Sequence, residues 1–240
     1  MSLTAARGPL GRDPAGRLAG DAAEGLVYLE PHPRRVQALV DGQAVIDTER
    51  ALLVHRPGRP LSYAFPVAEV GDLPSAPEPE APGFVQVPWD AVDTWVEEGR
   101  ELVHYPPNPY HRVDYRATNR RLRVEVAGTT LVDTEDTIIV FETAVSTKLY
   151  VAPDRVRTDL LRRSDTTSWC NYKGEATWWT AVVGDQVVED VAWSYEEPLD
   201  ESIAIRGHLS FDPERADVQA ELPVGSVAAD CGGECAAPSS

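Results

Sequence analysis

The chain has 240 residues, of which 42% are hydrophobic, and its formal net charge at pH 7 is -17. This length is enough for one large domain or for two small domains that each have a core. With 22 Lys and Arg against 39 Asp and Glu, the composition argues against a basic surface for a phosphate backbone or an anionic membrane. We therefore expect neither nucleic acid nor membrane as a partner, and the oligomeric state stays open.

The three cysteines, Cys170, Cys231 and Cys235, are too few and too unevenly spaced for a disulfide framework. We expect reduced thiols and a cytoplasmic location, because the N-terminal stretch also lacks the apolar run of a signal peptide. No CxxC pair occurs, and Cys231 with Cys235 provides only two of the four ligands that a structural zinc site requires. We predict no metal and no cofactor.

The first part of the chain reads as short strands that follow an arm. Residues 1–25 are rich in Gly, Ala and Arg without periodicity and predict a disordered or extended arm. After Arg34 apolar residues alternate on both sides of the turn pair Asp41-Gly42, which is typical of a β-hairpin. Two further apolar runs, 51–55 and 61–67, predict strands.

The next segment predicts a loop and then a helix. Residues 71–83 combine Pro, Gly and Ala with little to bury, which indicates an extended loop. Beyond this loop, Val92, Trp95 and Val96 are spaced as on one face of a helix. With Pro88 at its start and Gly99 at its end, the pattern predicts a short amphipathic helix over 89–99.

The chain then repeats itself. The text RRLRVEVAGTTLVDTEDTIIVF from Arg120 matches RRVQALVDGQAVIDTERALLVH from Arg34 without a gap, at an offset of 120 − 34 = 86. A glycine and the tripeptide Asp-Thr-Glu recur in register, which favours duplication. Trp193 is matched to Trp89 at an offset of 193 − 89 = 104, which gives the second copy 104 − 86 = 18 additional residues, and these fall on the stretch SDTTSWCNYKGEATWWT.

We predict an all-β fold of two tandem small domains with one or two short helices, because most apolar runs have a period of two. The first domain should span residues 26–115 and should lack the chemistry of the second. The second should span 116–222 and carry SDTTSWCNYKG, and a flexible tail should follow over 223–240.

The second copy resembles the domain of unknown function 427 family, which also carries the label nucleotidyltransferase-like. The resemblance rests on PDRVRTDLL, SDT, CxYKG and WSYEEPL, which lie within residues 120–220. The first copy resembles, more faintly, the degenerate leading domain of two-domain members. The resemblance implies a compact all-β architecture similar to the β-tent or Mss4-like fold, and it implies no established activity.

One departure from the family pattern bears on mechanism. Members usually have a run of the kind His-Cys-Pro-Tyr-Lys-Gly, whereas this chain has Trp169 before Cys170. A thiol without a cationic neighbour is mostly protonated at neutral pH. The substitution therefore weakens a Cys-His nucleophile, although Lys173 could supply a cation if the loop folds back.

Each candidate site residue has a structural alternative. Cys170 is either a nucleophile or a small buried hydrophobe, and Lys173 is either a fixed ammonium for an anionic ligand or a solvated turn residue. Glu142 is either a pocket acid or a strand-end cap, and Tyr195 is either a ligand contact or a corner residue. The remaining candidates for ligand binding, each with a core or surface alternative, are Tyr172, Trp179, Thr166, Trp193 and His208.

Two functions follow from these residues. In the first, the chain is an enzyme for a small molecule, with Lys173 holding an anionic or carbonyl group and Glu142 or Tyr195 assisting proton transfer. In the second, the same residues bind a ligand without chemistry. The sequence has no Gly-rich phosphate loop and no Asp-x-Asp pair for magnesium, so we set nucleotidyl transfer aside.

Overall fold

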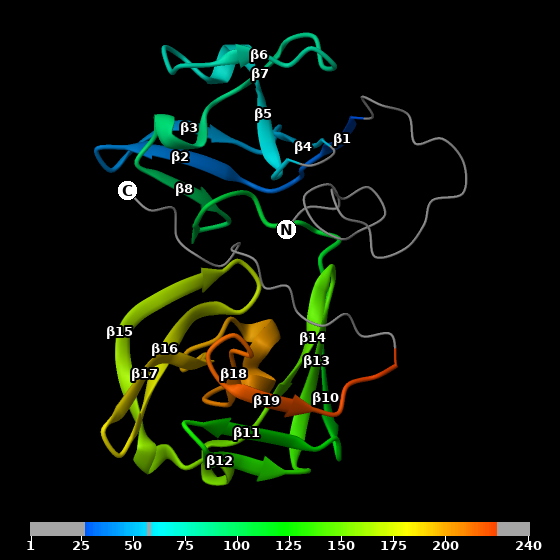
Figure 1. The fold of residues 1–240 in the computed structure, drawn as a ribbon. Helices are drawn as coiled ribbons and strands as arrows, with labels where there is room; N and C mark the ends of the chain where they lie inside the picture. The colour runs from blue at the N-terminus through cyan, green and yellow to red at the C-terminus, as the bar shows by residue number, and fades with distance from the viewer. Residues whose placement is uncertain (1–26, 57–58, 225–240) are drawn as a thin grey trace. The chain divides into compact units, whose positions relative to one another are not determined.

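The computed structural model of the chain describes residues 27–56 and 59–224. Strands dominate these residues, and the helical segments are short turns of 3-10 helix, so the prediction of an all-β fold is confirmed. The chain divides between His111 and Arg112 into two compact units (Figure 1). Each unit has its own hydrophobic core, and the first and second units are described separately below.

The first unit contains two antiparallel sheets, with strand orders β1-β4-β5-β7-β6 and β3-β2-β8-β9. The strands are β1 (Tyr28–Pro31), β2 (Val36–Val40), β3 (Gln43–Thr48), β4 (Leu52–His55), β5 (Ser62–Pro66), β6 (Ala76–Pro77), β7 (Phe84–Gln86), β8 (Thr94–Glu97) and β9 (Arg100–Leu102). Two 3-10 turns, η1 (Val67–Glu69) and η2 (Trp89–Ala91), connect them. Both sheets contribute to the core, where the ring of Trp95 stacks on Phe65 and Trp89 at centroid distances of 5.6 and 5.2 Å.

The predicted helix over 89–99 is wrong. Only the three residues of η2 are helical, and β8 follows with alternate residues Trp95 and Glu97 buried. Gly99 does not end a helix but forms, with Glu98, the two-residue turn between β8 and β9. Both turn residues have positive φ, 47° and 82°. Pairing with β2 therefore makes β8 a strand, because the alternating burial of its residues has the period of two that a sheet requires.

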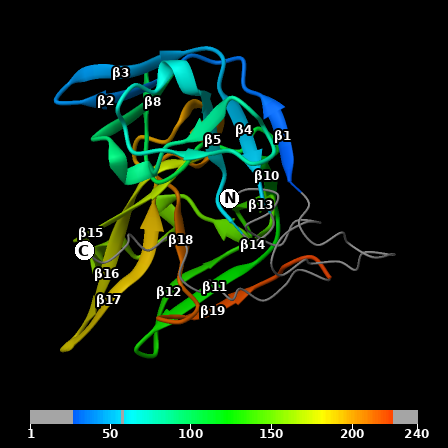
Figure 2. The same cartoon turned by 90° about the horizontal axis from the view of Figure 1, so that it is seen from above.

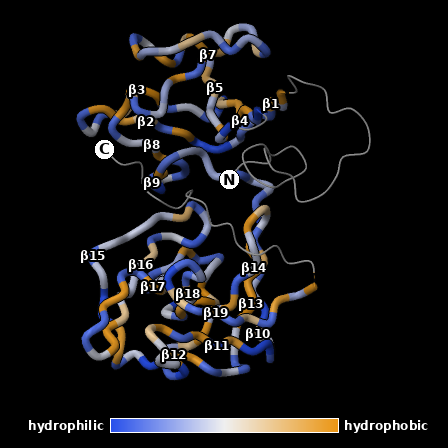
Figure 3. Tube along the Cα trace, viewed as in Figure 1, coloured by the Kyte–Doolittle hydropathy of each residue, from blue (hydrophilic) through white to orange (hydrophobic). Residues whose placement is uncertain are grey.

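The second unit contains three antiparallel sheets, with strand orders β10-β13-β14, β12-β11-β19 and β15-β16-β17-β18. The strands are β10 (Val113–Thr118), β11 (Leu122–Val126), β12 (Thr129–Thr134), β13 (Thr137–Glu142), β14 (Val145–Tyr150), β15 (Leu161–Cys170), β16 (Gly174–Val183), β17 (Gln186–Ser194), β18 (Leu209–Phe211) and β19 (Asp217–Ala220). The 3-10 turns are η3 (Pro153–Arg155), η4 (Thr158–Leu160) and η5 (Asp200–Ile205). Hydrophobic and hydrophilic residues alternate along many of these strands (Figure 3).

Two cores lie within the second unit. The larger one gathers residues of β11, β12, β16 and β17 around Leu122, Val124 and Leu131. The smaller one gathers Tyr150, Tyr195 and Ile205 with residues of β13 and β16. Figure 1 shows β13 and β14 on one side of this unit and the long strands β15 to β17 on the other. Seen from above in Figure 2, β15, β16 and β17 run side by side, as their pairing requires.

The hairpins of the two units have the same register at the offset of 86 seen in the sequence. Val36 pairs with Thr48 and Leu122 pairs with Thr134, and each hairpin contains a register shift at the same place. The turn residue before the glycine has φ of 49° in the first unit and 50° in the second, and both glycines have φ of 73°. The same offset holds for β1-β4-β5 against β10-β13-β14.

Ion pairs recur at the same offset. Arg35 binds Asp47, and Arg121 binds Asp133, each through two nitrogens of the guanidinium. A second pair recurs with its charges exchanged. Arg50 binds Glu69 in the first unit, and at the two positions 86 residues later Asp136 binds Arg155.

The match of Trp89 to Trp193 is wrong, because the two residues lie in unlike elements. Trp89 begins η2, whereas Trp193 lies in β17 and pairs with Trp178. The strand that pairs with β2 is β8, and the one that pairs with β11 is β19. Trp95 faces Ala38 and Val218 faces Val124, an offset of 218 − 95 = 123. The second unit thus has 123 − 86 = 37 additional residues in the part of the chain that contains the strands β15 to β17.

The two hairpin glycines should be equivalent in energy. An alanine at Gly128 would meet nothing within 4 Å, so its cost comes from the left-handed backbone alone. We expect Gly128→Ala and Gly42→Ala to lower the free energy of unfolding by similar amounts, roughly 1–2 kcal/mol. Urea denaturation followed by circular dichroism measures this, and a neutral effect at either turn would contradict the assigned turn geometry.

Candidate functional site

Lys173 lies in the tight turn between β15 and β16. Cys170 pairs with Gly174 at the base of this turn, and the Lys173 amide donates to the Cys170 carbonyl at 3.3 Å. Gly174 has φ of 96°, and a Cβ there would lie 3.4 Å from the backbone nitrogen of Leu199. Leu199 in turn donates to the Lys173 carbonyl at 3.0 Å. Glycine is thus favoured by the positive φ of the turn, while a Cβ would meet the segment after β17 at about van der Waals contact.

The ammonium of Lys173 forms an ion pair with the carboxylate of Glu142. Both side chains are largely buried, with exposed fractions of 9% and 10%. Lys173 is therefore not a solvated turn residue. Glu142 ends β13, where the register with β14 shifts after Val140, and it faces the interior of the unit. The pair joins two sheets that are formed by distant parts of the chain.

Tyrosine side chains surround the pair. Tyr195 and Tyr150 are almost fully buried, and the ring centroid of Tyr195 lies 6.0 Å from the Lys173 Nζ. The hydroxyls of Tyr115 and Ser202 lie 2.5 Å apart, and Ser202 donates to the carbonyl of Tyr172 at 2.9 Å. These contacts fix the turn that carries Lys173 against β10 and η5.

Charge and burial act in opposite directions on the titratable groups. Burial is the largest single effect on the pKa of Lys173 and disfavours the charged amine. The Glu142 carboxylate, together with smaller contributions from Cys170, Tyr195 and Tyr150, outweighs burial and raises the pKa of Lys173 well above 10.5. Burial raises the pKa of the Tyr195 hydroxyl well above 10, although the Lys173 ammonium lowers it. Burial also raises the pKa of Tyr150. At neutral pH the cluster thus holds a charged amine and neutral phenols.

The structure brings some of the predicted site residues together and separates others. Cys170 and Trp193 pack on the smaller core beside Tyr195, and Tyr172 contributes its carbonyl. Three candidates lie elsewhere: Trp179 packs on the larger core, Thr166 is exposed and donates to Asp190, and His208 contacts the carbonyl of Arg206. Cys231 and Cys235 lie outside the described residues.

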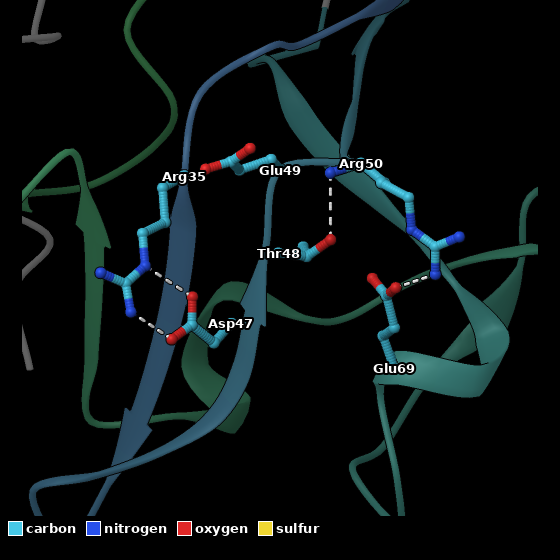
Figure 4. A pocket seen from close by; sticks show the side chains of 6 residues that line it. All are labelled: Arg35, Asp47, Thr48, Glu49, Arg50 and Glu69. Atoms are coloured by element: carbon cyan, nitrogen blue, oxygen red, sulfur yellow. Dashed lines mark hydrogen bonds and ion pairs between the residues drawn. The ribbon is translucent and has the colours of Figure 1, made fainter.

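A shallow pocket of about 330 Å³ lies in the first unit, and Figure 4 shows its lining. The lining residues are Arg35, Asp47, Thr48, Glu49, Arg50 and Glu69. Both arginines already bind carboxylates of the pocket itself. The charges of the pocket are therefore largely compensated internally.

Sequence reasoning missed a buried polar cluster in the first unit. The carboxylate of Glu97, 5% exposed, is bound by His32 at 2.7 Å, Tyr63 at 2.6 Å and Arg34 at 2.5 Å. Burial would raise the pKa of Glu97, but these donors outweigh it and lower the pKa to about 2. The donors are spread along the chain, so nothing local in the sequence indicates this cluster.

Residues 114–221 match the family described as a domain of unknown function, DUF427. The match supports the family resemblance of the second unit. No curated protein matches the chain. The DUF427 match contains both members of the Lys173–Glu142 pair, as well as Tyr115, Tyr150 and Tyr195. The first unit, with its shallow pocket and its Glu97 cluster, lies outside the match.

Over 27–56 and 59–224, no group of three or more His, Cys, Asp or Glu side chains is placed to hold a metal ion. In those same ranges no helix has the length and apolar character needed to cross a membrane.

Removing one partner of the ion pair in the DUF427-like unit should be costly. Lys173→Met leaves the Glu142 carboxylate buried without the ammonium, and Glu142→Gln leaves the ammonium buried without the carboxylate. We expect each variant to lose roughly 3–5 kcal/mol of stability. The double variant should lose less than the sum, as a double-mutant cycle from urea denaturation would measure.

The control for this cycle is the exposed pair of Arg157 and Asp159, whose side chains are 55% and 61% exposed. Arg157→Met should change the stability by less than about 0.5 kcal/mol. Additive losses at Lys173 and Glu142 would show that the two groups do not interact as described.

The Glu97 cluster should make the stability of the first unit sensitive to acid. The folded pKa of about 2 lies below the ordinary value of 4.5, so the stabilisation is complete above pH 4.5 and is lost as the pH falls toward 2. Glu97→Gln should flatten stability against pH in this window. Thermal unfolding at several pH values measures it, and an unchanged slope would contradict the assigned donors.

Proposed function

We propose that the second unit is a small-molecule enzyme whose reacting centre is the Lys173–Glu142 pair. Lys173 would hold an anionic or carbonyl group of the substrate, and Glu142, assisted by Tyr195, would transfer a proton. The observation that supports this most directly is the burial of the pair among tyrosines, with side chains only 9% and 10% exposed.

Desolvation makes this pair expensive to bury. Burying two charges costs several kcal/mol per ion, and well-packed apolar residues are often as stabilising as a buried pair. A charged amine, a carboxylate and neutral phenols in one cluster therefore suggest a role beyond packing. The family match neither adds to nor weakens this argument, because its description states no activity.

The protonation state of Lys173 limits the chemistry. Its raised pKa keeps the amine charged, which suits electrostatic stabilisation of a developing oxyanion and not attack on a carbonyl carbon. The Glu142 carboxylate would serve as base, and the neutral Tyr195 hydroxyl would donate. No cofactor enters this proposal.

A non-catalytic binding module is the second candidate. In this candidate function, a ligand exchanges its own polar groups for the contact between Lys173 and Glu142, and no covalent bond is made or broken. Such a ligand would need both an acceptor for the ammonium and a donor for the carboxylate.

We further propose that the first unit is a degenerate copy of the second that lacks the site. Its hairpin register and ion pairs at the offset of 86 support duplication. At the position of Glu142 it has Arg56, which binds the buried Glu78 at 2.5 Å. The charges there are thus reversed, and no strands correspond to β15–β17 among its described residues.

The proposal is tested with the full chain and a panel of monocarboxylates, 2-oxo acids and aldehydes. Binding is measured by isothermal titration calorimetry and turnover by proton NMR. We expect Lys173→Met to weaken binding by about 10- to 100-fold, because a charge-assisted hydrogen bond is lost. Glu142→Gln should retain binding but abolish turnover, and Arg157→Met should change neither.

Three outcomes separate the candidates. Turnover that disappears in Glu142→Gln supports the enzyme. Binding without turnover in the unaltered chain supports the binding module. Binding that is unaffected by Lys173→Met would overturn both, because the ammonium would then not touch the ligand.

A further inference from the structure

A row of aromatic rings leads from the Lys173–Glu142 pair along one face of β16 and β17. Trp178 and Trp193 pair directly across these strands, with ring centroids 5.4 Å apart. Trp193 then meets Tyr150 edge-on at 6.4 Å, and its Nε1 donates to the Tyr150 hydroxyl at 3.0 Å. Tyr150 shares the smaller core with Tyr195, whose ring centroid lies 6.0 Å from the Lys173 Nζ.

Strand alternation explains why these residues share a face. Ala176 and Trp178 are two residues apart on β16. Trp193 lies in β17, and Tyr195, two residues later, directly follows the last residue of that strand. Ala176, Trp193 and Tyr195 all pack in the smaller core. Trp179 points the other way, into the larger core. The row of Trp178, Trp193 and Tyr150 is hereafter called the aromatic row.

The indole faces of this row are reached by charged side chains. The guanidinium of Arg215 lies 5.8 Å from the ring centroid of Trp178, and the amine of Lys148 lies 5.9 Å from that of Trp193. Arg215 is 45% exposed, and both indoles are only partly buried. A cation over an indole face marks a position that a planar ring can also take, because both interact with the same π-surface.

We propose that the ligand of this site is an aromatic acid or aromatic carbonyl compound whose ring stacks on the aromatic row while its oxygen meets the ammonium of Lys173. This inference rests on the proposed function, since it assigns the substrate class of the same site. Aliphatic acids would find the ammonium but would lack the stacking.

Benzoate and cyclohexanecarboxylate test this, because they have the same carbon skeleton and the same carboxylate but differ in the ring. Their affinities for the full chain are measured by isothermal titration calorimetry. We expect benzoate to bind about tenfold more tightly than cyclohexanecarboxylate, because stacking of its ring on the aromatic row adds to the binding free energy. Trp178→Leu should remove most of this preference while leaving the affinity for cyclohexanecarboxylate within about twofold.

Two further variants keep the result interpretable. Trp178→Phe retains an aromatic face and should retain most of the preference. Trp169→Leu removes an indole whose Nε1 contacts Asn171 instead, and should leave the preference unchanged. The thermal midpoint of each variant shows whether the fold persists.

The outcomes distinguish this inference from the proposed function. Equal affinities for the two acids, both lost in Lys173→Met, would overturn the aromatic class and leave the Lys173 site intact. A preference for benzoate that survives Trp178→Leu in a folded protein would overturn the role of the aromatic row. No binding of either acid would also overturn the aromatic assignment, and the wider panel would then decide the proposed function alone.

Discussion

The buried pair of Lys173 and Glu142 is the constraint on which the second unit most depends. One charge comes from the turn between β15 and β16, and the other comes from the end of β13. Neither can be buried alone without a large desolvation cost, so the two sheets must close in one register for both charges to be compensated. The glycine after Lys173 and the Ser202 bridge to Tyr115 hold the turn where this closure requires it.

The first unit meets a similar demand with a different solution. Its buried carboxylate, Glu97, is compensated by three donors, and Arg56 with Glu78 stands at the position of Glu142 with reversed charge. Exchanged charges preserve the attraction between two positions while changing both residue types. A sequence comparison therefore does not detect structural equivalence of this kind, as the Arg50–Glu69 and Asp136–Arg155 pairs also illustrate.

The sequence predicted the all-β class and the shared hairpin because both depend on local signals, namely alternation and a glycine in a tight turn. It failed over 89–99, where helical spacing of Val92, Trp95 and Val96 competed with pairing to β2, a contact that spans more than fifty residues. It named Lys173 and Glu142 but not their contact, which depends on a register shift in β13. It could not tell that Trp179 packs on the larger core while its neighbour Trp178 contacts Trp193, because the two residues differ only in the face of β16 to which they belong.

The position of Trp178 bears on how a ligand could reach a pair so deeply buried. Aromatic rings are nearly incompressible. A ligand could therefore pass along the aromatic row only if the side chains of Trp178 and Trp193 rotate. Trp193 is held by its hydrogen bond to Tyr150, whereas Trp178 is held through Ser168 on the edge strand β15. An edge strand has one neighbour only and opens at lower cost than a central strand. We therefore expect the proposed ligand to enter on the β15 side, past Trp178.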